Sequence, residues 1–158
     1  MQKNSQTLCI GCDLGRRSWM RLAVSSTGLV VIGGNISGCG NPTGSPPTGP
    51  VPAGNVSELS VGTLRVMSNV VIARDSGGVY AMSAVCTHAG CLISDAAGTI
   101  AEGLRCPCHG STFNGDGEVT GGPAPVPLQH YAVTIATDGT ITVDGSQPVA
   151  ASTRTPPS

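Results

Sequence analysis

The sequence contains few aromatic residues and few charged residues. Aromatic residues make up 3% of the 158 residues, charged residues make up 11%, and the formal net charge is −1. The positive charges gather near the amino terminus, where residues 1–38 hold Lys3, Arg16, Arg17 and Arg21 against one aspartate. The rest of the chain is mildly acidic. An acidic body lacks the basic surface that binds nucleic acid, so this class of partner is disfavoured.

Long apolar runs and helical periodicity are also missing. The apolar run at residues 22–32 is diluted by glycine and serine and is shorter than the roughly 20 residues that span a bilayer. The 23 glycines and 12 prolines favour short strands and turns. Short apolar or alternating runs predict strands, and Asp138-Gly139 predicts the turn of a closing hairpin. The predicted strands are 64–67, 70–75, 79–85, 131–137 and 140–144. The expected fold is all-β, with small antiparallel sheets.

The amino-terminal segment has the pattern of an export signal rather than of a folded element. The stretch GRRSWMR at residues 15–21 resembles a twin-arginine export signal, which assigns residues 1–38 to a signal segment. An uncleaved anchor helix is the alternative. The stretch ISGC at residues 36–39 resembles a lipobox and makes Cys39 a candidate lipidation site. Cys9 and Cys12 form a C-x-x-C pair to which we assign no role.

The composition also divides the rest of the chain. Residues 39–55 are rich in proline and glycine and predict an unstructured tether. Residues 56–145 carry the predicted strands and form the predicted globular domain, and residues 146–158 are expected to be a flexible tail. A lipid at Cys39 followed by such a tether would hold the domain at a membrane surface.

Two short cysteine- and histidine-containing loops interrupt the predicted strands. They read CTHAGC at residues 86–91 and CPCHGS at residues 106–111. Two disulfides are one interpretation, and a zinc site is another. Zinc sites favour paired cysteines and paired histidines, whereas each of these loops mixes the two residue types. A [2Fe–2S] centre suits the mixture better, because each loop could supply one ligand to each iron.

This pair of loops closely resembles the cluster-binding boxes of the Rieske family, over about residues 56–145. The resemblance implies a [2Fe–2S] cluster in a subdomain made of the two loops. It implies four ligands, namely Cys86, His88, Cys106 and His109. It also implies a disulfide between Cys91 and Cys108, as in the quinol-oxidising branch of the family, and such a disulfide requires an oxidising compartment.

The resemblance extends to residues around the two boxes. Ser111 matches a serine that donates to a bridging sulfide, although the turn backbone is its alternative partner. Phe113 stands where high-potential members carry a tyrosine, so a potential below the top of the family range is expected. A proline loop that covers the cluster matches Gly122, Pro123, Ala124 and Pro125. His130 lies outside the boxes and is expected at the surface or at a strand start, rather than as a ligand.

The expected function is electron transfer outside the cytoplasm. The resemblance implies a periplasmic, membrane-tethered protein that takes electrons from quinol in a cytochrome bc-like complex and passes them to a c-type cytochrome. Its proton uptake would be coupled to reduction at the ligating imidazoles. Such a chain is a subunit rather than a complete enzyme. The alternatives are a small subunit of a molybdenum oxidase of the arsenite oxidase type, a stand-alone periplasmic electron carrier, and a zinc-binding structural protein.

Overall fold

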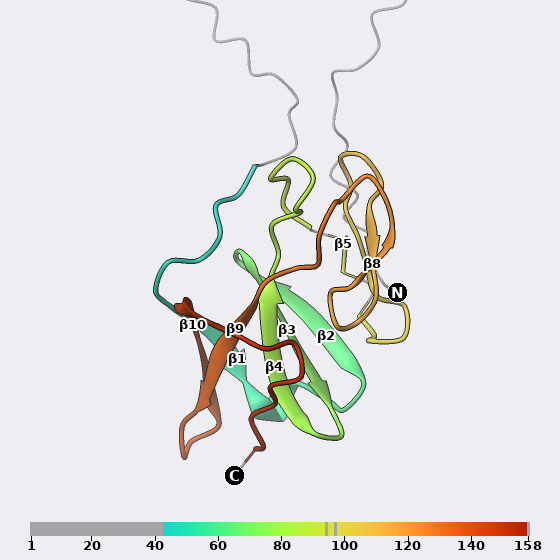
Figure 1. Cartoon of the computed structure of the whole chain (residues 1–158). Coiled ribbons are helices and arrows are strands. Elements are labelled where there is room, and N and C mark those ends of the chain that lie inside the picture. Colours follow the sequence, from blue (N-terminus) through green and yellow to red (C-terminus); the bar gives the residue numbers. More distant parts are fainter. Residues whose placement is uncertain (1–42, 94, 97, 158) are drawn as a thin grey trace, which may run out of the picture. The chain divides into compact units, whose positions relative to one another are not determined.

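The computed structural model describes residues 43–157, apart from residues 94 and 97 (Figure 1). The predicted signal segment at 1–38, with Cys9 and Cys12, lies outside the described residues, and so does Cys39. In the part of the chain that the structure describes, no helix is long and apolar enough to cross a membrane.

Two antiparallel sheets make up the fold, which confirms the all-β prediction. The larger sheet has the order β1-β10-β9-β4-β3-β2, and the smaller has the order β5-β6-β7-β8. The strands of the larger sheet are β1 (Pro50–Asn55), β2 (Thr63–Met67), β3 (Val70–Asp75), β4 (Gly78–Ser83), β9 (His130–Ile135) and β10 (Thr140–Val149). The smaller sheet contains β5 (Asp95–Ala96), β6 (Leu104–Arg105), β7 (Thr112–Phe113) and β8 (Val119–Gly121), and a single 3-10 turn, η1 (Val56–Glu58), follows β1.

Strands β3 and β4 are buried on both faces and separate two apolar cores. Side chains alternate along a strand, so Val71 of β3 and Met82 of β4, which are register partners, share one face. Val70 and Ile72 point to the other face, where residues from β1 and β10 cover them. Burial on both faces explains why β3 begins with a continuous apolar run instead of an alternating one.

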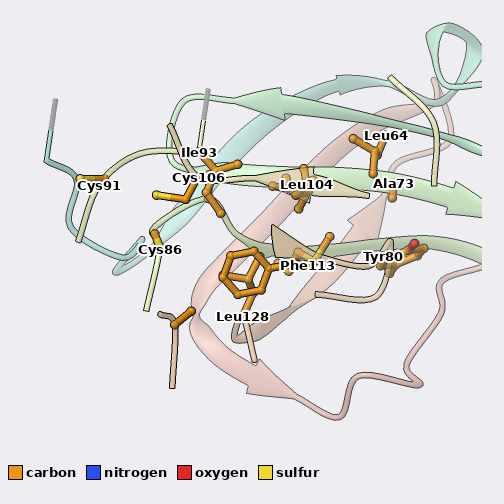
Figure 2. Packing of buried hydrophobic residues seen from close by; sticks show 14 residues of the cluster. Leu64, Ala73, Tyr80, Cys86, Cys91, Ile93, Leu104, Cys106, Phe113 and Leu128 are labelled. Atoms are coloured by element: carbon orange, nitrogen blue, oxygen red, sulfur yellow. The ribbon is translucent and has the colours of Figure 1, made fainter. Parts of the chain in front are cut away.

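The first core lies between the larger sheet and the smaller sheet. It joins side chains of β3 and β4 to Leu104 of β6 and Phe113 of β7, and it extends to three cysteines. Figure 2 shows Cys86, Cys91 and Cys106 at one end of this core, with Phe113 farther inside. The two Cys/His loops therefore stand on a packed apolar base, which restricts how far their backbones can move.

Part of the predicted tether belongs to the sheet. Residues 50–55 form β1, which pairs with β10 in the register Pro50↔Asp144, Val51↔Val143 and Pro52↔Thr142. The prediction of a free linker up to residue 55 is therefore wrong for this stretch. Its prolines suggested a linker, but a proline is tolerated in an edge strand because one side of that strand needs no hydrogen-bond donor.

The predicted flexible tail is also ordered against the domain. Strand β10 continues to Val149, and Thr155 exchanges two backbone hydrogen bonds with Val79, each of 2.8 Å. The Arg154 guanidinium pairs with Asp75 and Asp116 and stacks 3.8 Å from the ring centroid of Tyr80. The flexible-tail prediction is therefore wrong for residues 146–156, because these partners lie far away in the sequence and leave no local pattern.

Candidate metal centre

The two Cys/His loops have the same backbone design. In the first loop, the Cys86 N–H donates to the Cys91 carbonyl at 2.9 Å, and the Gly90 N–H donates to the Cys86 carbonyl at 3.0 Å. The second loop repeats these bonds between Cys106, Gly110 and Ser111, at 2.8 and 3.0 Å. Gly90 and Gly110 both have positive φ, of 74° and 76°, which explains the glycine at the same place in each loop.

The predicted ligands converge at one end of the domain. Cys86 and Cys106 are free, buried thiols that belong to the same apolar core. His88 and His109 are exposed, and their ring centroids lie 4.7 Å apart in an edge-on arrangement. The site thus has a buried pair of sulfurs and an exposed pair of imidazoles, with one member of each pair from each loop.

Burial and backbone hydrogen bonds act in opposite directions on the Cys106 sulfur. Burial raises the pKa of the Cys106 thiol, while hydrogen bonds from the backbone N–H groups of Cys108 and His109 oppose that shift. The same N–H donors would stabilise a metal-bound sulfur, which carries negative charge. Two buried thiols with such donors and two nearby imidazoles match the donor set of a Cys₂His₂ [2Fe–2S] cluster.

The disulfide between the loops is present. Cys91 and Cys108 are bonded, with a Cα–Cα distance of 6.5 Å and a sequence separation of 17. This confirms the pairing that the family resemblance implied. The sulfurs of Cys91, Cys106 and Cys108 also form a group within 4.8 Å. Because two of these sulfurs are bonded to each other, the group places the disulfide beside Cys106 and is not a separate metal site.

Further contacts tie the proline loop to both Cys/His loops. The fully buried Ser111 hydroxyl accepts a hydrogen bond from the Ala124 N–H at 3.0 Å. On the other side, the Thr87 hydroxyl donates to the Val126 carbonyl at 2.7 Å. The sequence reasoning did not single out Thr87, because a threonine between two ligands gives no sign of a distant partner. The Ser111 oxygen accepts one bond here and keeps its own proton for another.

Phe113 and His130 are both buried. Phe113 is 2% exposed and packs in the first core. His130 starts β9, as expected, but it is buried and not at the surface. Its Nε2 lies 2.8 Å from the Asp116 carbonyl oxygen, and because a carbonyl can only accept, Nε2 carries the proton. His130 thus supports the loop after β7 and does not approach the ligands through this contact.

A protein-family model matches the part of the chain that contains this site. The model of the Rieske [2Fe–2S] domain matches residues 49–132, which is more than half of the chain and includes both loops, the disulfide and the proline loop. The chain belongs to the Rieske [2Fe–2S] family. The match begins one residue before β1, which agrees with the placement of that strand in the domain.

Similar proteins carry related names. The Rieske chain is 39% identical over 101 residues to a cytochrome b6-f complex iron-sulfur subunit of Chlorobaculum tepidum. This match covers 56% of this chain and 54% of the relative. The chain is 44% identical over 59 residues to the Gloeobacter violaceus subunit of the same name, covering 37% and 31%. The chain therefore spans about half or less of the length of these relatives.

Solved structures include a plasma membrane Rieske protein of Synechocystis PCC 6803. It is 28% identical, its TM-score is 0.46, and the match covers 59% of this chain and 97% of that one. The ferredoxin of a carbazole 1,9a-dioxygenase from Nocardioides aromaticivorans is 25% identical, with a TM-score of 0.46 and coverage of 61% and 97%.

Proposed function

We propose that this Rieske protein is an exported, membrane-tethered electron-transfer subunit of a cytochrome bc-type complex. In this role it takes single electrons from a membrane quinol and passes them to a c-type cytochrome. The observation that carries the proposal is the pair of matched loops, which brings two buried thiols and two exposed imidazoles together beside a disulfide. The names of the relatives support the bc-type complex and do not favour the molybdenum oxidase alternative.

The four proposed ligands would bind the two irons in pairs. Cys86 and Cys106 would hold one iron from inside the domain, and His88 and His109 would hold the other at the surface. A cluster bound in this way supplies one-electron acceptance at roughly −150 to +300 mV, above plant-type ferredoxins. The second ring nitrogen of each exposed imidazole would then face the electron donor and could take up its proton.

The surface around the imidazoles suits an apolar partner. The exposed residues of the two loops and the proline loop carry no formal charge apart from any on the histidines; they include Ala89, Pro107, Pro123, Pro125, Val126 and Pro127. Val126 is 53% exposed, which is high for a large apolar side chain. Prolines have a fixed φ and no backbone donor, so this rim is stiff and binds little water. Such a rim would exclude water from a bound quinol.

Ser111 and Phe113 are proposed to adjust the potential in opposite directions. The free proton of the Ser111 hydroxyl can point to a cluster sulfur, which would raise the potential. Phe113 has no hydroxyl and fills the apolar core instead. This protein should therefore have a lower potential than family members with a tyrosine at that place.

The proposed lipid at Cys39 would hold the site close to the membrane. Thr43 forms an antiparallel bridge with Cys91, at the end of the first loop. Thr43 lies four positions after Cys39, so an extended chain between them spans at most about 14 Å. This short reach supports a donor that stays in the membrane, such as quinol.

Quinol-driven reduction of a c-type cytochrome in isolated membranes tests the proposal. Deleting the chain should abolish the activity, restoring the full chain should recover it, and restoring it with Cys106→Ser should not. Unchanged quinol oxidation after the deletion would overturn the proposed complex. Mass spectrometry of the membrane-extracted chain tests the anchor separately, since lipidation requires a mature protein that begins at Cys39.

A further inference from the structure

The segment before β1 lies against the first cluster-binding loop. The Gly44 N–H donates to the Gly90 carbonyl at 2.9 Å, next to the Thr43↔Cys91 bridge. Farther along, the Asn69 side-chain amide donates to the Ser45 carbonyl at 2.9 Å. Figure 1 shows this segment in cyan, leading from β1 to the loops beyond the larger sheet. Residues 43–48 of this segment lie outside the family match, which begins at residue 49.

We propose that residues 43–49, here named the strap, position the first cluster-binding loop, with Gly44 as the positioning residue. Gly90 follows His88 by two residues, and its own N–H closes the loop onto Cys86. Its carbonyl is the group that the strap holds. Gly90 is thus held on both sides, through its N–H by the loop and through its carbonyl by the strap.

The close approach of the strap depends on glycine at position 44. A Cβ at this position would lie 2.4 Å from Leu92 Cδ2 and 3.3 Å from Val85 Cγ2. A side chain here therefore forces either the strap or Leu92 to move, and moving the strap lengthens the Gly44–Gly90 hydrogen bond. Gly49 is in the same strap, but a Cβ there would meet nothing within 4 Å. The chain thus offers its own matched control.

The other strap contacts from Ser45 onward hold it to the larger sheet and to the turn at Ser68 and Asn69. Pro47 is buried against Gly145, and the Gly145 N–H donates to the Gly49 carbonyl at 2.9 Å. A groove of about 810 Å³ lies between the strap, the turn at Ser68 and Asn69, and Leu92. Thr43 and Gly44 make the strap contacts that reach the first cluster-binding loop.

The two cluster-binding loops are consequently supported in different ways. The second loop is tied through the Ser111 hydroxyl to the proline loop, within the matched family domain. The first loop is tied through Thr87 to the proline loop and, in addition, through Gly90 to the strap. Because the strap continues toward the proposed anchor, the first loop is the one that the membrane attachment could affect.

Hydrogen exchange and EPR on the full chain test the strap. Gly44→Ala should raise the exchange rates of the Gly44 and Gly90 amides roughly five- to tenfold, as expected when one hydrogen bond is weakened. It should also change the EPR line shape and midpoint potential of the reduced cluster. Gly49→Ala should change none of these, and Gly44→Ala with Leu92→Ala should restore them, since the smaller side chain makes room.

Equal exchange rates and spectra in the Gly44→Ala and Gly49→Ala variants would overturn the strap proposal. The inference rests on the proposed cluster for its EPR readout but not for its exchange readout. A wild-type protein without a Rieske signal would contradict the proposed function. In that case the exchange rates of the same variants would still decide the role of the strap.

Discussion

Replacement of Arg154 by alanine should release the carboxy-terminal segment and destabilise the domain. The Arg154 side chain is 17% exposed, and its Nε lies 2.5 Å from an Asp75 oxygen that belongs to a side chain 32% exposed. A second ion pair, to the half-exposed Asp116, has a distance of 2.6 Å. Stacking on Tyr80 adds a cation–π contact at 3.8 Å.

These contacts determine how much unfolding free energy the Arg154→Ala variant should lose. The half-exposed pair contributes little, and the partly buried pair and the cation–π contact contribute most, so the loss should be about 2–3 kcal/mol of unfolding free energy. Arg65→Ala is the matched control, because its pair with Glu58 is 3.4 Å long and more than half exposed. That variant should lose only about 0–0.5 kcal/mol. Urea unfolding followed by circular dichroism measures both, and equal losses would refute the reasoning.

The effect of Arg154 should depend on pH through Asp75. Burial raises the pKa of Asp75, but the hydrogen bond and charge of Arg154, with the Gly77 and Gly78 amides, outweigh it and hold the pKa below its usual value. A lowered folded-state pKa gives stability that is present above the unfolded pKa of about 3.9 and is lost as pH falls through the folded value. The difference between wild type and Arg154→Ala should therefore shrink below about pH 4. A constant difference down to pH 2 would contradict this assignment.

Three further variants probe the core and the site. Tyr80→Phe should cost about 1–3 kcal/mol in urea unfolding, because the Gly115 carbonyl loses its buried 2.9 Å partner, and an unchanged midpoint would contradict this. Replacing Cys91 and Cys108 together by serine should lower the unfolding free energy by about 3 kcal/mol, by the loop-entropy estimate. An unchanged unfolding free energy after reduction of the wild-type disulfide would contradict this prediction. Ser111→Ala should lower the midpoint potential in a redox titration and leave a buried N–H of the proline loop unpaired; an equal potential would exclude a tuning role.

Features with a local cause were predictable from the sequence. The run VVIARD and the hairpin turn at Asp138-Gly139 each express a backbone or burial requirement within a few residues. The structure places strand β3 at this run and gives Gly139 a φ of 82°. The disulfide followed from the family resemblance rather than from spacing, and the structure confirms it.

Features with distant causes were not predictable in this way. Strand β1 contains two prolines and is stabilised by β10, about 90 residues away. Arg154 finds Asp75 at a sequence separation of 79. The strands β5 to β8 have two or three residues each, which is too short for an alternating pattern to be recognised. Only the packed fold reveals these partners.

EPR spectroscopy of the purified full chain tests the central claim most directly, with samples measured as oxidised, after ascorbate and after dithionite. The account predicts a Rieske-type signal that is already present with ascorbate, and loss of that signal in Cys106→Ser. A signal that needs dithionite would contradict a role in quinol oxidation. Stoichiometric zinc without any signal would contradict the cluster itself.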